Sequence, residues 1–313
     1  MADFLFSLNT VLPMFLLLLL GYALRQKGIL DPATTGKLNT LVFYVALPAS
    51  IFYDTALTDF TEEFDIRFVL FTTGATAVSF LLAWGIARAV HMRREQLSAF
   101  VHGAFRGNYI YMGTALAKNI MGTDHLPLSQ LIVAFVIPLY NILAVILFSV
   151  AGNGQKLTFK KMVRDILTNP MIVAILAALP FALLHIPLPF AASKTLSYCG
   201  NLATPMALLI IGANFDLGNL AGNWKKAGLA TFHKLVLQPA LAVPLAYMMH
   251  FSTEAMVLIM VLLAVPSAAN SYIMTRSMGG DAELGSSIVV TTTLCSLLTM
   301  TLWIFGFKRM GII

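Results

Sequence analysis

Residues 102–113 read His102-Gly103-Ala104-Phe105-Arg106-Gly107-Asn108-Tyr109-Ile110-Tyr111-Met112-Gly113. This run puts three glycines, an arginine and an asparagine near the middle of an apolar segment, 95–121, that is long enough to cross a bilayer. Glycine weakens a helix interior, and an arginine in an apolar medium needs polar partners. We therefore expect Gly107-Asn108 to interrupt this helix. The glycines have a second interpretation, because glycine also lets membrane helices pack closely.

A second segment predicts a similar interruption. Residues 265–272 read Val265-Pro266-Ser267-Ala268-Ala269-Asn270-Ser271-Tyr272, inside the apolar segment 255–278. Pro266 has no N–H to donate and clashes with the preceding helical turn. Non-helical backbone at membrane depth persists only where protein or a water-filled cavity satisfies its polar groups. Paired breaks in equivalent helices predict a substrate site at their crossing, where half-helix N-termini direct N–H groups toward an anion.

The composition is that of a polytopic membrane protein. Of the 313 residues, 58% are hydrophobic and 11% are charged, and the mean hydropathy is +0.83. Soluble domains carry about 25% charged residues. The net charge of +6 does not indicate nucleic acid as a partner, because the Lys and Arg residues lie in short clusters between apolar runs. Cys199 and Cys295 lie in apolar stretches, so the sequence predicts no metal site, and we expect no cofactor.

The apolar segments predict ten membrane-spanning helices of about 20 residues each. They lie near 4–24, 35–54, 66–90, 95–121, 127–151, 165–185, 191–214, 226–250, 255–278 and 283–306. The fold class is therefore all-α, with five helices in each of two repeats. We place the first repeat at 1–151, a cytoplasmic linker at 152–164 and the second repeat at 165–313.

An internal duplication is indicated by residues that coincide when the chain is shifted by 157 positions. The pairs are Pro13 with Pro170, Pro32 with Pro189, Pro48 with Pro205, and Asp59 with Asp216. Most Lys and Arg residues fall on one side of the predicted membrane, which short cytoplasmic loops would explain, so both termini are expected outside. Since each repeat has five helices, the second repeat enters the membrane from the opposite face, which gives inverted topology.

Two cations lie deep inside predicted helices, Arg106 in the fourth and Lys234 in the eighth. A charge at that depth is a functional-site hypothesis, although long cationic side chains also extend to the membrane surface or bind backbone carbonyls. No Asp or Glu lies in the middle of any predicted helix, which disfavours a carboxylate proton relay and leaves His233 as a weaker candidate. A substrate that supplies its own negative charge fits this core better. Among the neutral polar residues, Asn141 is the best candidate for a binding role.

Five motifs occur in order along the chain. They are Arg106-x-Asn108, Tyr140-Asn141, Asn169-Pro170, Lys234 with Pro239, and Pro266 to Asn270 followed by Gly279-Gly280-Asp281-x-Glu283. In this order they resemble the auxin efflux carrier family, and in particular its bacterial branch of proposed malonate and other carboxylate carriers. The resemblance covers essentially the whole chain. It implies a scaffold half, a transport half and an elevator-type movement about crossed helices four and nine, on a fold similar to that of bile-acid sodium symporters.

The resemblance also implies roles for individual residues. Asn108 and Asn270 would lie at the crossing and contact the substrate carboxylate, and Pro266 would make the break in the ninth helix. Plant members have a proline in both crossing helices, whereas residues 95–121 contain none. Gly107 with Asn108 must therefore supply the break in the fourth helix.

The resulting hypothesis is an efflux-type secondary transporter, not an enzyme, that carries a small organic anion such as a mono- or dicarboxylate across the bacterial inner membrane. Arg106, Asn108 and Asn270 are the expected substrate contacts, and Asn141 and Lys234 support them. A sodium- or proton-coupled symporter on the same fold is the nearest alternative, and a membrane sensor that binds without transporting is another. An intramembrane enzyme would need paired acids that this core lacks. A homodimer is compatible with the sequence.

Overall fold

The computed structural model describes residues 2–57, 64–151, 164, 167–215 and 220–313, which form helices and no strand. Labels with η denote π-helical turns. The helices are α1 (Ala2–Gln26), α2 (Pro32–Leu41), η1 (Val42–Ala46), α3 (Leu47–Ala56), α5 (Ile66–Ala89), α6 (Arg94–Phe105), η2 (Tyr109–Gly113), α7 (Thr114–Met121), α8 (Pro127–Leu131), η3 (Ile132–Val136), α9 (Ile137–Ala151), α11 (Pro170–Leu183), α12 (Phe190–Asn201), α13 (Ala203–Ala213), α14 (Leu220–Phe232), η4 (His233–Leu237), α15 (Gln238–Met248), α16 (Thr253–Ala264), α17 (Ala269–Ser277) and α18 (Ala282–Arg309).

The all-α membrane fold is confirmed. Within the described residues, 6 helical segments are long and apolar enough to cross a membrane: Asp3–Gln26, Ile66–Ala89, Pro127–Ala151, Phe190–Ala213, Gly222–Met248 and Ala282–Arg309. Two shorter helices, Pro170–Leu183 and Thr253–Ala264, are also apolar. The arrangement of ten crossings in two inverted repeats stays a prediction. Of the residues that suggested the duplication, Asp59 and Asp216 lie outside the described residues.

Asparagine, aspartate and proline mark where several helices begin. The Asn169 side chain accepts a hydrogen bond from the Met171 N–H at 2.9 Å, with Pro170 as the first helical residue. Proline is well suited to that position, because its missing N–H would have no partner there. Helix α11 therefore begins at Pro170, later than the residue 165 predicted from apolarity alone. The Asp281 carboxylate caps α18 in the same way, through the Leu284 N–H at 3.0 Å.

Three prolines inside long helices are accommodated by π-turns. Turns η1, η3 and η4 each end two residues before a proline, at Pro48, Pro138 and Pro239. In each case the residue just before the proline donates its N–H to a carbonyl five residues back. A proline clashes with the carbonyl four residues earlier, and the wider π-turn relieves that clash without ending the helix. The prolines therefore mark local widening in helices that continue.

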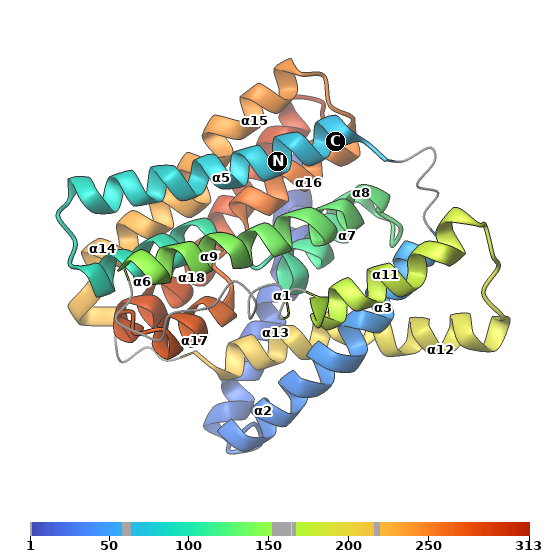
Figure 1. Cartoon of the computed structure of the whole chain (residues 1–313), viewed down its shortest axis with the longest axis horizontal. Helices are drawn as coiled ribbons and strands as arrows, with labels where there is room; N and C mark the ends of the chain where they lie inside the picture. The colour runs from blue at the N-terminus through green and yellow to red at the C-terminus, as the bar shows by residue number, and fades with distance from the viewer. Residues whose placement is uncertain (1, 58–63, 152–163, 165–166, 216–219) are drawn as a thin grey trace.

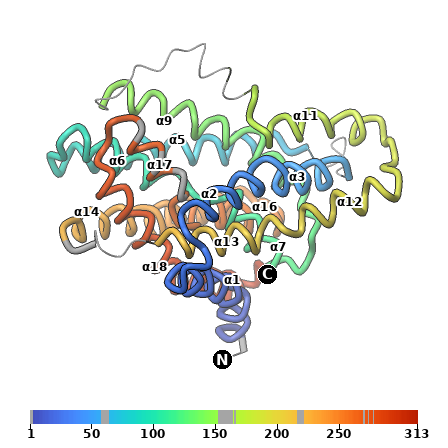
Figure 2. The backbone as a smooth tube through the Cα atoms, turned by 90° about the horizontal axis from the view of Figure 1, so that it is seen from below, coloured from blue at the N-terminus to red at the C-terminus, as the bar shows by residue number. Residues whose placement is uncertain are grey.

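The helices form two groups (Figures 1 and 2). Helix α3 packs against α11 and α12, and these lie together at one end of the molecule, with α2 and α13 adjoining them. Helices α5, α6, α9 and α14 to α18 make up the other group. Helix α1 contacts both groups, through α13 on one side and α18 on the other. The segments η2 and α7 also bridge the groups, since η2 contacts α13 and α7 contacts α16.

Candidate functional site

Two interrupted helices meet at their breaks. Helix α6 ends at Phe105 and α16 ends at Ala264, and after each break the chain becomes helical again a few residues later. Between the halves, Gly107 and Ser267 form an antiparallel β-bridge. The Asn108 N–H donates to the Pro266 carbonyl at 2.8 Å, and the Ala268 N–H donates to the Arg106 carbonyl at 3.2 Å. The two breaks therefore satisfy part of each other's backbone, as non-helical segments at membrane depth require.

The residue types at the breaks explain this geometry. A Cβ on Gly107 would lie 3.0 Å from the Leu262 carbonyl oxygen, so only glycine lets the two backbones come this close without a shift. Pro266 favours an extended residue before it, and Val265 is extended with ψ 149°. The run that suggested an interruption from sequence therefore contains the residue that the close approach needs.

The continuous helix formed by η4 and α15 supplies donors for the ends of both first half-helices. From η4, the Lys234 ammonium donates to the carbonyls of Leu262 at 3.3 Å and Leu263 at 2.9 Å, in the last turn of α16. One turn further on, the Gln238 Nε2 donates to the Ala104 carbonyl at the end of α6. Helix ends leave their last carbonyls without partners, and in an apolar medium each such group is costly. Lys234 is fully buried, so it acts here as a helix cap.

Ser267 adds a further contact across the crossing. Its hydroxyl donates to the Gly103 carbonyl of α6, and its N–H donates to the Thr292 hydroxyl of α18 at 3.1 Å. The bridge residue Ser267 is therefore joined to α6 and α18 as well as to Gly107. These bonds fix the position of the break relative to both α6 and α18.

Arg106 is the residue directly after α6; its backbone is extended and its side chain is half-buried. Its guanidinium donates to the Asn141 side-chain oxygen on α9 at 3.0 Å and lies 5.9 Å from the centre of the Tyr140 ring. The Met274 sulfur on α17 lies 4.0 Å away. The two ion pairs in the described part of the chain are Lys118 with Asp54 and Arg309 with Asp3, so neither neutralises Arg106. The guanidinium has five N–H donors, and an anion is the natural partner for those that protein groups leave over.

The two predicted asparagines lie at the starts of the second half-helices. Asn108 is 3% exposed, and its carbonyl accepts from the Met112 and Gly113 N–H groups in η2. Its side-chain amide forms no hydrogen bond with another described residue. Asn270 is the second residue of α17, and its side chain is not among the parts the structure describes. The structure thus brings Arg106 and Asn141 together and places Lys234 against the end of α16. Asn108 lies next to the bridge residue Gly107.

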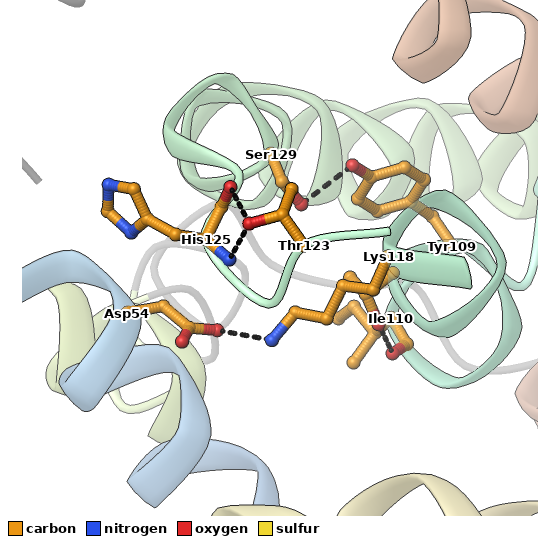
Figure 3. Close-up of polar contacts among 8 residues, drawn as sticks. Asp54, Tyr109, Ile110, Lys118, Thr123, His125 and Ser129 are labelled. Carbon is orange, nitrogen blue, oxygen red and sulfur yellow. Dashed lines mark hydrogen bonds and ion pairs between the residues drawn. The ribbon is translucent and has the colours of Figure 1, made fainter. Parts of the chain in front are cut away.

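A small cavity of about 40 Å³, lined by polar and apolar residues, adjoins the start of η2, and Ile110 and Thr114 line it from the bridging segment. Two of its lining residues form an ion pair, in which Lys118 of α7 lies 3.1 Å from Asp54 of α3 (Figure 3). The Asp54 side chain is 15% exposed and that of Lys118 26%. Beside it, the hydroxyls of Tyr109 and Ser129 are 2.8 Å apart, which joins η2 to α8 (Figure 3). Helices α3 and α13 line this cavity together with η2, α7, α8 and η3.

Some of these groups were not expected from the sequence. Gln238 carried a weak signal, its spacing of four residues from Lys234 on one helical face, whereas Ser267 carried none beyond its place next to Pro266. Asp54 and Lys118 are both at helix margins, but nothing in the sequence pairs them. Within the described residues, no group of three or more His, Cys, Asp or Glu side chains lies where it could hold a metal.

Comparisons with known proteins also indicate a membrane transporter. The sequence model of a family described as "Membrane transport protein" matches residues 6–304. A protein of Rhizobium meliloti named "Putative malonate transporter" is 29% identical over 298 residues, which cover 93% of this chain and 92% of that protein. An "Uncharacterized transporter" of Methanothermobacter thermautotrophicus is 23% identical, covering 96% and 98%. The Escherichia coli "Uncharacterized transporter YfdV" is 21% identical, covering 96% and 97%.

Proposed function

Since the chain belongs to the membrane transport protein family, which is the auxin efflux carrier family, we propose that it carries a small organic anion, a mono- or dicarboxylate, through the crossing of its two interrupted helices. The family and the names of the relatives describe transporters, not enzymes. The observation that carries the proposal is Arg106, a cation held by Asn141 and Tyr140 beside the break. The name of the Rhizobium meliloti protein supports a carboxylate as the anion.

The proposal includes two inverted repeats of five helices. Shifting residues 94–121, which contain α6 and α7, by 157 positions gives 251–278, which contain α16 and α17. Equivalent segments related by a two-fold axis in the membrane plane run in opposite directions where they meet. The antiparallel bridge between Gly107 and Ser267 supports that relation. In this arrangement both termini lie on the outer side of the bacterial inner membrane.

The proposal places the anion between Arg106 and the starts of the second half-helices, where Asn108 and Asn270 lie. The N-termini of η2 and α17 direct free N–H groups and a partial positive charge toward it. Elevator-type movement of the group that contains the crossing, against the group of α3, α11 and α12, would expose the anion alternately on the two sides. Efflux needs no coupling ion, because one negative charge leaving a cell with an interior of −100 mV gains about 2.3 kcal/mol.

Flux through purified protein in proteoliposomes tests the proposal. We expect saturable exchange of labelled malonate that unlabelled dicarboxylates inhibit and that the neutral analogue malonamide does not. Malonamide has a similar shape without the charge, so it isolates the electrostatic contribution. Malonate binding without flux would instead identify a sensor, and the absence of both for a panel of carboxylates would refute the proposal.

The ion pair between Asp54 and Lys118 is expected to break during each transport cycle, because it joins α3 of one group to α7, which follows the crossing directly in the chain. Replacing Asp54→Lys sets two cations against each other, and we expect flux to fall about tenfold, since repulsion at a partly buried site costs roughly 1–2 kcal/mol. Lys118→Asp should act similarly. The double exchange Asp54→Lys with Lys118→Asp should restore most of the flux. A double variant no better than either single variant would show that the pair has no part in transport.

A further inference from the structure

The ammonium of Lys234 lies in a complete shell of neutral oxygens. It donates to the Leu263 carbonyl at 2.9 Å, to the Leu262 carbonyl at 3.3 Å and to the Gln238 side-chain oxygen at 3.3 Å. The side chain is 0% exposed. Neither ion pair found in the described part of the chain involves Lys234. The three donors of this ammonium therefore have three oxygen partners and no counter-ion.

The position of this oxygen shell is that of a coupling-ion site. The carbonyls of Leu262 and Leu263 belong to the last turn of α16, directly before its break. Half-helix C-termini carry partial negative charge, and in transporters with broken helices they coordinate the coupling cation. Here the chain itself places a monovalent positive charge at that point. The space around it is limited, because a Cβ on Gly107 would lie 3.0 Å from the ammonium nitrogen.

A simple cap would not need a charge. The neighbouring end of α6 is capped by the neutral Gln238 amide and the Ser267 hydroxyl. Burying an ammonium without a carboxylate is costly. Because only one of the two helix ends has an ammonium, we infer that the charge serves a function that a neutral donor could not. A fixed cation at the crossing raises the local potential for an anion as a bound sodium ion would, and it does not dissociate.

We propose that Lys234 is a tethered substitute for a coupling cation, so that the carrier moves its anion without sodium. The part of this inference that concerns sodium-free transport rests on the proposed function. The cation site itself can be tested by binding alone. It predicts that removing the ammonium leaves the Leu262, Leu263 and Gln238 oxygens open to a free monovalent cation of suitable size.

The test compares purified wild-type protein with Lys234→Ala in sodium chloride and in choline chloride at equal ionic strength. The wild-type melting temperature and malonate flux should be the same in both salts. The melting temperature of Lys234→Ala should be about 3 °C or more higher in sodium chloride, because a ligand that binds only the folded state stabilises it. Labelled ²²Na⁺ should bind to this variant and not to the wild type.

Two matched variants complete the experiment. Lys234→Arg keeps a charge at the site and should stay insensitive to sodium. Lys226→Ala removes another cation of the same region, whose ammonium donates to Gln96 at 2.7 Å, and should also stay insensitive.

Sodium-dependent flux or sodium binding by the wild type would overturn the inference. So would a Lys234→Ala protein that is equally stable in both salts, or that fails to fold in both, since sodium would then not replace the ammonium. Because ²²Na⁺ binding needs no flux, these results stay distinct from a failure of the transport proposal.

Discussion

Replacing Arg106 with alanine is expected to lower carboxylate flux by roughly 100-fold while the protein stays folded. A hydrogen bond to a charged group is worth up to about 3 kcal/mol, and each 1.4 kcal/mol changes an equilibrium tenfold. Arg106 is half-buried, and its side-chain partners among the described residues, Asn141, Met274 and the Tyr140 ring, are neutral. Removing it therefore takes away attraction for an anion and leaves no carboxylate unpaired.

The measurement is initial malonate uptake into proteoliposomes, with gel-filtration profile and melting temperature as evidence of folding. Arg106→Lys keeps the charge but loses the planar group that reaches both Asn141 and the Tyr140 ring, so partial flux is expected. Arg67→Ala is the matched control. Arg67 is exposed and donates at 2.8 Å to the Met249 carbonyl, just after the end of α15, so its loss should leave flux unchanged. Wild-type flux in Arg106→Ala would remove Arg106 from the mechanism.

Replacing Gly212 with alanine should destabilise the whole protein. Helices α1 and α13 are in close contact, and a Cβ on Gly212 would lie 1.9 Å from the Leu18 carbonyl oxygen. The reciprocal position is equally tight, since a Cβ on Gly21 would lie 2.1 Å from the Leu209 carbonyl oxygen. Backbone oxygens in two packed helices have no flexible end that can move aside. The helices must therefore separate, and in lipid such packing of small residues is a main source of helix association.

We expect Gly212→Ala to cost roughly 3 kcal/mol, the upper end of the usual cost of an added methyl group in a packed interior. The melting temperature in detergent should fall, and the monodisperse fraction should shrink. Gly228→Ala is the matched control, because no atom lies within 4 Å of a Cβ at that position of α14. It should be neutral or slightly stabilising, since alanine favours helix more than glycine does. Equal melting temperatures for the two variants would contradict the packing described for α1 and α13.

Much of the fold could be predicted because its signals are local. Apolar length predicts long helices, Asn169 with Pro170 predicts a helix start, and Pro266 and Gly107 predict non-helical backbone. The prolines were harder to interpret. Pro48, Pro138 and Pro239 look from sequence like kinks, whereas each follows a π-turn inside a continuing helix. Whether a helix absorbs a proline depends on its neighbours, which the local sequence does not specify.

The candidate site could be predicted in composition but not in its pairings. The depth of Arg106 and Lys234 is visible in the sequence, because charges in apolar segments are rare. Their partners are not. The carbonyls that Lys234 caps come from residues 28 and 29 positions away, and the acceptor for Arg106 is 35 positions away. Such contacts depend on how helices cross, and tertiary packing decides that.

The most direct test of the central claim, that a negatively charged solute crosses the bilayer at the meeting point of the two broken helices, is the electrical current evoked by malonate. Proteoliposomes adsorbed on a solid-supported membrane would be exposed to a rapid step of malonate. For wild type we predict a saturable transient current with the sign of negative charge entering the vesicles, the same in sodium and in choline buffer, and absent in Arg106→Ala. Folded wild-type protein that gives no current with malonate or any other small carboxylate would contradict the account.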